Sequence, residues 1–260
     1  MPFQQMGPFR FYQFETLMQP DLIHAIVTRQ GGVSPEPWYS LNVGGNVGDE
    51  SARVRENLRR ACGVVGRDPH SIFDVWQVHS SRVVRANRPR SGRELIKADV
   101  LISNDPGVTL FMRFADCVPI FFYDPVHRAI GLVHSGWLGT VRGASVAAVQ
   151  AMAEAFGTHP EDLCVGIGPA IGPDHYPIGP EVVERVRKAF GSSAGNHLRI
   201  HDGEVYLNLW SANRDLLERE GVKSVEVAEL CTACHLEDWY SHRGEGQITG
   251  RFGAMIALDA

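Results

Sequence analysis

The middle of the chain holds three apolar runs in close succession, and this pattern constrains the fold more than any other feature. The runs are GVTLFMRF (107–114), VPIFFYD (118–124) and RAIGLVHS (128–135). Each has the length and the β-branched and aromatic content of a buried strand. Only Ala115, Asp116 and Cys117 separate the first two runs. We therefore expect three core strands, with a short polar break between the first and the second.

Helical and extended segments are mixed along the rest of the chain. Helices are expected at 51–62, with Asp49 as its N-cap, and at 139–156, 180–190 and 207–221. Further strands are expected at 22–29, 162–172, 225–230 and 252–258, a strand or hairpin at 74–86, and a long loop at 31–50. The elements do not alternate strictly as βαβ units, which favours an α+β fold with a mixed sheet over a doubly wound one. No linker or repeat divides the chain, so we expect one catalytic domain over residues 1–260.

Composition excludes several classes of function. The net charge is −5, and positive and negative residues are interspersed along the chain. This pattern does not predict the basic patch that a nucleic-acid-binding protein needs. No long apolar stretch predicts a membrane span, and the first residues do not resemble a secretory signal. Five cysteines in such a chain favour catalytic or metal-binding thiols over disulfides. We expect a cytoplasmic monomer that acts on small molecules.

Three residues of types that bind transition metals lie where apolar segments end or break. They are His79 in WQVHSSRV, Cys117 in FADCVPIFFYD and His134 in GLVHSGWLGT. Two histidines and one cysteine match the protein ligands of a catalytic zinc, which leaves a fourth position open for water. The same residues could instead be two core-edge histidines and a small buried thiol. A third interpretation is a Cys–His pair with Cys117 as nucleophile.

A separate pattern, CTACH (231–235), matches the C-x-x-C-H signature of covalent haem attachment. That chemistry takes place outside the cytoplasm, so we do not expect haem here. Cys231 and Cys234 are interpreted as part of the pocket wall, with a redox role as the alternative.

The chain resembles the YfiH/DUF152 family along nearly its whole length, from about residue 22 to 258. The segments that carry the resemblance are TRQGGVSPEPWYSLNVGGNVGDE, QVHSSRVV, ADVLIS, FADCVPIFFYD, GLVHSGWLGT, VGIGPAIGPDHY, LCTAC, SHR and TGRFG. The family has been called multicopper polyphenol oxidoreductase (laccase), and also purine nucleoside phosphorylase with adenosine deaminase activity. Its fold is α+β with mixed sheets and flanking helices, similar to the catalytic domain of a bacterial toxin deamidase.

The resemblance implies that His79, Cys117 and His134 are the metal ligands and the catalytic residues. The expected cofactor is Zn²⁺, with Cu²⁺ as the alternative. The chain departs from the family pattern at Leu138, where relatives carry arginine, so Arg142 or another basic residue would have to replace that arginine. It departs again at Ala170, where relatives often carry cysteine.

Four further residues are expected to bind the substrate: Asn42, Asp116, Arg243 and Arg251. An Asx-turn for Asn42, a satisfied loop carboxylate for Asp116 and surface positions for the two arginines are the alternatives. Phosphate could be held by Arg29, Arg243 or Arg251, together with the backbone amides of GIGPAIG (166–172).

True multicopper chemistry is disfavoured by the histidine pattern. The chain has eleven histidines but no H-x-H pair, and His127, His159 and His175 lie beside Asp or Pro in turn-like contexts. The H-x-E and P-C-x-x-C signature of zinc nucleobase deaminases is also absent. Any deamination would therefore depend on the metal held by His79, Cys117 and His134.

The sequence together with the resemblance predicts a zinc-dependent purine nucleoside phosphorylase. It would cleave adenosine, inosine or 5′-methylthioadenosine with phosphate, and would also deaminate adenosine. The alternatives are a copper-dependent polyphenol oxidase, a Cys–His amidohydrolase that edits a peptidoglycan precursor, and a metal-binding module without activity.

Overall fold

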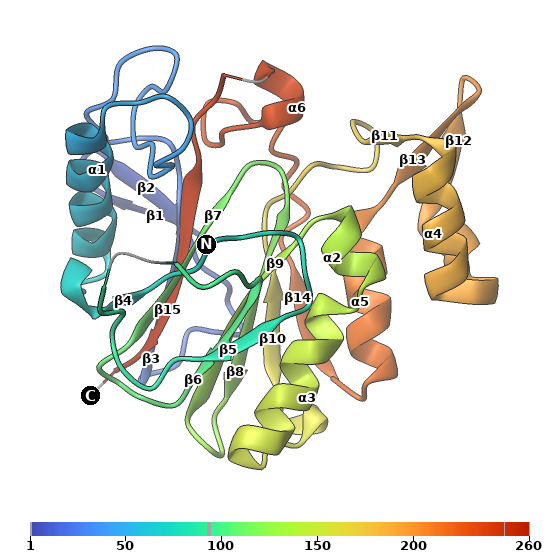
Figure 1. Cartoon of the computed structure of the whole chain (residues 1–260), viewed down its shortest axis with the longest axis horizontal. Coiled ribbons are helices and arrows are strands. Elements are labelled where there is room, and N and C mark those ends of the chain that lie inside the picture. Colours follow the sequence, from blue (N-terminus) through green and yellow to red (C-terminus); the bar gives the residue numbers. More distant parts are fainter. Residues whose placement is uncertain (1, 93–94, 247, 260) are drawn as a thin grey trace.

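Two six-stranded sheets lie face to face in the computed structural model, which describes residues 2–92, 95–246 and 248–259 (Figure 1). The first sheet has the order β1 (Phe3–Met6), β2 (Phe9–Tyr12), β3 (Leu22–Val27), β15 (Phe252–Leu258), β7 (Thr109–Phe114) and β4 (Ile72–Phe73). Its neighbouring strands are antiparallel except for the parallel pair β4 and β7.

The second sheet has the order β14 (Ser224–Val227), β10 (Cys164–Ile167), β8 (Val118–Asp124), β9 (Ala129–Ser135), β6 (Val100–Ser103) and β5 (Val83–Arg85). The pairs β10–β14 and β5–β6 are parallel, and the other pairs are antiparallel. A small antiparallel sheet contains β11 (Pro177–Ile178), β13 (Glu204–Leu207) and β12 (Leu198–His201). Both large sheets are mixed, which confirms the predicted α+β class.

Helices cover the two outer faces of the stacked sheets (Figure 1). The described α-helices are α1 (Ser51–Val64), α2 (Trp137–Val141), α3 (Ala144–Phe156), α4 (Pro180–Phe190), α5 (Leu209–Arg219) and α6 (His242–Glu245). Helix α1 packs on the outer face of the first sheet, while α3 and α5 pack on that of the second. Short 3₁₀ turns lie at Pro69–Ser71, Pro160–Asp162 and Gly191–Asn196.

The alternation of side chains along the central strands explains the layers. In β8, Ile120 and Phe122 pack toward the helices, whereas Phe121 and Tyr123 pack against the first sheet. Successive side chains of a strand point to opposite faces, so a strand that is apolar throughout must be covered on both sides. This is why the three central runs are uniformly apolar rather than alternating.

Loops at one end of the stack carry the chain from one sheet to the other. Residues 74–82 lead from β4 to β5, residues 115–117 from β7 to β8, and residues 228–251 from β14 to β15. These segments contain most of the residues that the sequence marks as functional. The crossing loops therefore place those residues together at the rim between the sheets.

Several predicted elements differ from the structure. The strand or hairpin expected at 74–86 is wrong over most of its length, because only Val83–Arg85 is a strand and His79 has a left-handed backbone with φ of 58°. The expected helix at 139–156 is two helices, because Gly143 has a φ of 71° between them. Asp49 is not the N-cap of α1: that position is Glu50, and the Asp49 carboxylate accepts hydrogen bonds from Ser34 and Asn42 instead.

Candidate metal centre

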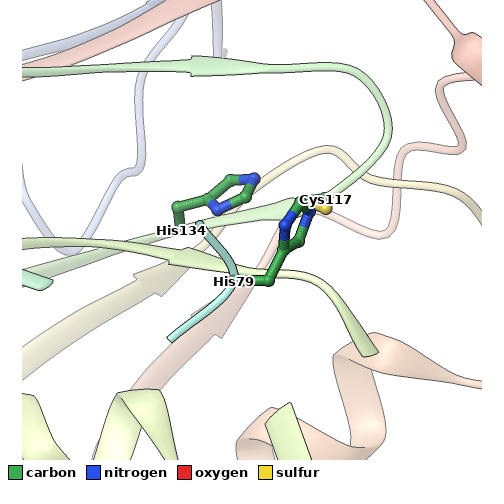
Figure 2. A group of neighbouring side chains, drawn as sticks. All are labelled: His79, Cys117 and His134. Carbon is green, nitrogen blue, oxygen red and sulfur yellow. The ribbon is translucent and has the colours of Figure 1, made fainter. Parts of the chain in front are cut away.

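Three side chains from separate segments meet at the rim between the two sheets, as Figure 2 shows. His79 comes from the crossing that precedes β5, Cys117 from the crossing that precedes β8, and His134 from the end of β9. One ligand atom from each residue lies within 4.8 Å of the others. The structure thus brings together the three residues predicted to bind metal, although 38 and 17 positions separate them in the chain.

Close packing around Cys117 depends on the glycine that follows β9. A Cβ atom at Gly136 would lie 2.5 Å from the Cys117 Sγ and 3.3 Å from the His79 Cδ2. Such a distance to sulfur is well inside van der Waals contact, so a larger residue would displace the thiol. Gly136 is therefore the small residue that lets two of the ligands approach each other.

Asp99 contacts two of the three candidate ligand residues. Its Oδ1 lies 2.9 Å from the His134 Nδ1, which leaves the Nε2 of that ring free to bind a metal. The same carboxylate accepts hydrogen bonds from the backbone amides of Val78, His79 and Ser80, and from the Ser80 hydroxyl. A carboxylate behind a histidine ligand fixes the tautomer and orientation of the ring. Asp99 also holds the His79 loop in its left-handed conformation.

The electrostatics of the triad favour a thiolate. Burial raises the pKa of the Cys117 thiol, but the adjacent His134 and His79 outweigh this effect and lower it below its usual value. Burial lowers the pKa of His134, whereas the Cys117 thiolate and Asp99 raise it above its usual value. Burial also raises the pKa of Asp99, but its contacts with His134 and Ser80 lower it to about 2. The electrostatics therefore favour a Cys117 thiolate next to a protonated His134, with the Asp99 carboxylate behind that ring.

The donor set fits a soft or borderline transition metal. One thiolate and two imidazoles are ligands that zinc and copper both accept, and an oriented second-shell carboxylate is typical of such centres. The residues that would hold the ion are His79, Cys117 and His134.

A cleft made of two cavities surrounds the triad. A cavity of about 390 Å³ lies on one side and is lined by residues that include Asp74, Gln77 and Arg113. A cavity of about 440 Å³ lies on the other side and is lined by residues that include Trp137, Tyr176 and Arg243. The two share His79, Ala115, Cys117 and Arg251. Each is large enough for part of a small organic substrate.

Arg251 and Arg243 are the predicted substrate residues that line the cleft with positive charge. Arg251 Nη1 donates to the carbonyls of Thr249 and Gly250, while its Nε and Nη2 have no hydrogen bond to any residue that the structure describes. Burial lowers the pKa of Arg251, and the nearby Asp116 and Cys117 oppose that effect. Arg243 lies over the ring of Tyr176, with 5.1 Å from its Cζ to the centroid.

The other two predicted substrate residues are committed to contacts within the protein. Asn42 is fully buried; its Oδ1 accepts from the amides of Gly44 and Arg251, and its Nδ2 donates to Asp49. Asp116 accepts from the Thr232 hydroxyl and from the backbone amide of Arg243. Asp116 lines the 440 Å³ cavity, whereas Asn42 lines neither cavity.

The other groups predicted to bind phosphate already form hydrogen bonds or ion pairs within the protein. Arg29 forms an ion pair with Glu245 and donates to the carbonyl of Tyr39. Four amides of GIGPAIG already donate hydrogen bonds within the protein. Gly168 donates to the Pro119 carbonyl and Ala170 to the Leu230 carbonyl. Ile171 donates to the Asp116 carbonyl, and Gly172 to the Cys231 Sγ. Arg142, which could have replaced the family arginine missing at Leu138, donates to the carbonyl of His79. The cationic groups that remain for a substrate anion are therefore mainly Arg243 and Arg251.

Sequence reasoning missed several residues of the cleft. Asp99 lies in the predicted strand-like segment ADVLIS, where its role behind His134 has no local sequence signal. Trp137 lies within GLVHSGWLGT and Tyr176 within VGIGPAIGPDHY, but only the fold places both against the 440 Å³ cavity. Within the described residues, a second group of metal-ligand side chains is formed by His175, Cys231 and Cys234.

No helix in the described part of the chain has both the length and the apolar character to span a bilayer.

Comparison with known proteins gives consistent matches. Residues 23–259 match the family described as multi-copper polyphenol oxidoreductase laccase. A Bacillus subtilis protein named purine nucleoside phosphorylase YlmD is 33% identical over 247 residues, which cover 92% of this chain and 89% of that protein. A Deinococcus radiodurans purine nucleoside phosphorylase is 34% identical over 235 residues, with 90% and 88% covered.

Solved structures are similar over the whole chain. The crystal structure of YlmD from Geobacillus stearothermophilus has a TM-score of 0.92 at 31% identity and covers 100% of this chain and 99% of that one. The crystal structure of the Bacillus licheniformis hypothetical protein YfiH has a TM-score of 0.91 at 31% identity, with 99% of each chain covered.

Proposed function

The chain belongs to the multi-copper polyphenol oxidoreductase laccase family, also known as YfiH/DUF152, and from that premise we propose that it is a metal-dependent purine nucleoside phosphorylase. Relatives whose sequences are 32% to 34% identical to this chain carry the name purine nucleoside phosphorylase. The observation that carries the proposal is the juxtaposition, in one cleft, of the His79, Cys117 and His134 triad with the guanidinium groups of Arg243 and Arg251.

Phosphorolysis needs an anion site next to a nucleoside site. The free donors of Arg251 and the guanidinium of Arg243 supply the charge that would hold phosphate. Trp137 and Tyr176 offer ring surfaces on which a purine can stack in the same cavity. In the reaction, a phosphate oxygen forms a bond to the ribose C1′ while the bond from C1′ to the base breaks. The base leaves with the electron pair and takes up a proton.

We assign zinc to the triad as the cofactor. An ion on these ligands would supply Lewis-acid polarisation of a bound substrate or water. Asp99 would keep the His134 ring oriented toward the ion, and Gly136 would leave room for Cys117 to reach it. Adenosine deamination and cleavage of 5′-methylthioadenosine are part of the same proposal. Deamination would use a water polarised by the ion beside the purine base, and cleavage of 5′-methylthioadenosine would use the same phosphate site as the other nucleosides.

The test is product analysis with adenosine, inosine and 5′-methylthioadenosine, each with and without phosphate, on zinc-loaded protein. Base release that depends on phosphate, together with ribose 1-phosphate or its 5-methylthio analogue, is expected. Inosine formed from adenosine without phosphate would report deamination. If no free base appears with any of the three nucleosides, the proposal is wrong.

Arg251→Gln tests the anion site directly. Loss of a charge-assisted hydrogen bond of about 1.5–3 kcal/mol predicts a decrease of about 10- to 150-fold in kcat/KM for phosphate. Arg214→Gln is the matched control, because Arg214 is exposed and pairs only with Glu218 among the described residues. If the Arg251→Gln enzyme keeps the same kcat/KM for phosphate, Arg251 does not bind the phosphate.

A Cys–His hydrolase is the second candidate, and one observation favours it. His134 contacts Asp99 through Nδ1 and faces Cys117, so the three side chains have the order of a nucleophile, a base and an orienting acid. Its substrate would be an amide such as that of a peptidoglycan precursor. Chelator treatment separates the two functions: a thiol hydrolase keeps its activity without metal and loses it on alkylation, while the phosphorylase loses its activity when the ion is removed.

Copper-dependent phenol oxidation accords with the name of the family but less well with the ligands. Multicopper oxidases need a three-copper cluster built from many histidines, whereas the described residues form only two three-ligand groups, which hold three histidines and three cysteines together. Oxygen-dependent oxidation of a phenol by copper-loaded protein, absent from protein loaded with zinc alone, would contradict this assessment.

A further inference from the structure

The C-x-x-C-H segment that resembles a haem motif lies next to a histidine from another part of the chain. Cys231 and Cys234 belong to the crossing between β14 and β15, and His175 belongs to the loop between β10 and β11. Their ligand atoms all lie within 4.8 Å of one another. The His175 Nδ1 is 3.8 Å from the Cys231 Sγ and 3.6 Å from the Cys234 Sγ.

These distances match the edges of a tetrahedral metal site. Bonds of about 2.3 Å from zinc to sulfur and about 2.0–2.1 Å to nitrogen place neighbouring sulfur and nitrogen ligands about 3.6 Å apart. The Nδ1 atom of His175 is thus already near its ligand distance from both thiols. Only small side-chain movements separate the cluster from a coordinated geometry.

The backbone around Cys231 supports a ligand role. The amide of Gly172 donates to the Cys231 Sγ over 3.2 Å, a bond that becomes stronger when the sulfur carries negative charge. The amides of Cys234 and His235 both donate to the Cys231 carbonyl, and Cys231 forms a β-bridge with Ala170. The first cysteine is therefore fixed in place.

The site is open to solvent and its thiols are free. Cys234 and His175 are exposed, while Cys231 is half-buried. An ion can enter without unfolding of the core, and a fourth position remains for water. Binding would release the two thiol protons and requires no oxidant.

We propose that His175, Cys231 and Cys234 form a second metal site, which takes zinc with a water molecule as the fourth ligand and shares no residue with the His79, Cys117 and His134 triad. Two thiolates and one imidazole are an established ligand set for zinc with an open fourth position. This site lies outside the chemistry of the proposed function and does not depend on it.

The ion would tie together two segments that form the wall of the cleft. Thr232, between the two cysteines, donates to the Asp116 carboxylate over 2.7 Å, and Asp116 directly precedes the triad ligand Cys117. Tyr176 follows His175 and lies against the Arg243 guanidinium. A metal at the second site would thus fix the positions of Asp116 and Tyr176 in the cleft.

Metal content of a triad-deficient protein tests the proposal. In the His79→Ala/Cys117→Ser variant, about one zinc per chain is expected after loading and gel filtration. Adding Cys234→Ser should abolish this zinc, and in the cobalt-loaded protein it should also abolish the thiolate-to-cobalt absorption. Adding Cys164→Ser instead is the control and should leave both unchanged, because Cys164 lies away from the cluster in β10. Equal zinc content with and without Cys234→Ser overturns the proposal.

Alkylation of the unmodified protein gives a site-resolved second test that needs no variant. Zinc is expected to slow iodoacetamide labelling of Cys231 and Cys234 by about tenfold or more, as read by peptide mass spectrometry, and to leave the labelling of Cys164 unchanged. Unchanged labelling of Cys234 contradicts the proposal, and so does a Cys231–Cys234 pair that reacts only after a reductant is added. No nucleoside enters either assay, so a failed phosphorylase test leaves both results interpretable.

Discussion

The carboxylate of Asp99 is fully buried and accepts hydrogen bonds from two of the segments that supply the candidate metal ligands. One oxygen contacts the His134 ring, and both contact the loop that carries His79. A single residue therefore sets the position of one ligand and the backbone of another.

Asp99→Asn should weaken metal binding more than it weakens the fold. An amide has one acceptor oxygen in place of two, so it cannot serve both His134 and the amides of the His79 loop. We expect a decrease in zinc affinity of about 10- to 100-fold, measured by competition with a chromophoric chelator. Asp105→Asn is the matched control, because Asp105 accepts from a loop amide far from the triad. Equal affinities for the two variants would show that Asp99 does not orient the ligands.

His24 gives a prediction about pH. Its ring is buried in β3, its Nε2 accepts from the Phe14 amide, and its Nδ1 has no partner among the described residues. Burial lowers the pKa of His24 to about 4. The unfolded chain takes up the proton near pH 6.5, before the folded protein does.

The free energy of unfolding should therefore fall by up to about 3 kcal/mol through His24 as the pH decreases from 6.5 to 4, and should be unaffected above that window. Urea unfolding at several pH values measures the slope. His24→Gln should remove this part of the slope, while His201→Gln should not, because His201 is exposed. A His24→Gln protein with the same pH slope as the unmodified protein would contradict the assignment.

At the scale of the elements, the turn from β9 into α2 determines how closely the ligands pack. Gly136 is the N-cap of α2 and faces Cys117 and His79. Because its φ is −80°, alanine fits the backbone there, and the obstacle is the side-chain contact alone. The local backbone and the metal site can thus be tested separately.

Gly136→Ala is expected to displace the Cys117 thiol and abolish tight zinc binding with a modest effect on stability. Gly63→Ala is the control, since nothing lies within 4 Å of a Cβ at that position in α1. The control should keep full zinc binding and gain about 0.5–1 kcal/mol of stability. Zinc titration and thermal unfolding of both variants provide the measurements. Normal zinc affinity in Gly136→Ala would mean that the triad tolerates the extra methyl group.

The strands of the core could be predicted from the sequence, but the shape of the ligand loops could not. The runs at 118–124, 180–190 and 252–258 match β8, α4 and β15 to the residue, because buried periodicity and the first-turn proline are local signals. The conformation of residues 74–82 depends on the Asp99 carboxylate, which lies 20 positions beyond His79 in the chain. The partner of Cys231 and Cys234 is His175, and nothing in the local pattern of either segment points to the other.

At the scale of the whole molecule, the two large sheets share one apolar interior. Side chains from β7 and β15 in the first sheet pack against side chains from β8 and β9 in the second. The C-terminal strand β15 lies between β3 from the N-terminal part and β7 from the middle of the chain. Neither sheet can form from one continuous piece of sequence, and we therefore propose that the chain is a single domain.

We therefore predict one cooperative unfolding transition. Far-UV circular dichroism and tryptophan fluorescence should give the same midpoint in urea, because loss of one sheet exposes the apolar face of the other. Ala254→Pro removes a hydrogen bond in the middle of β15 and should lower the stability by about 3 kcal/mol or more in both signals together. Two separated transitions would instead indicate two independent units.

The crossings of the chain between the sheets have a consequence for the life of the protein in a cell. Cys117 and His79 lie on two of these crossings. An ion bound to both would therefore cross-link two segments that pass between the sheets. The bound state gains stability with the logarithm of free zinc concentration over the dissociation constant. Chains made when zinc is scarce should therefore open more often and be degraded sooner. The abundance of the protein would then follow the zinc supply even where its gene is expressed at a constant rate.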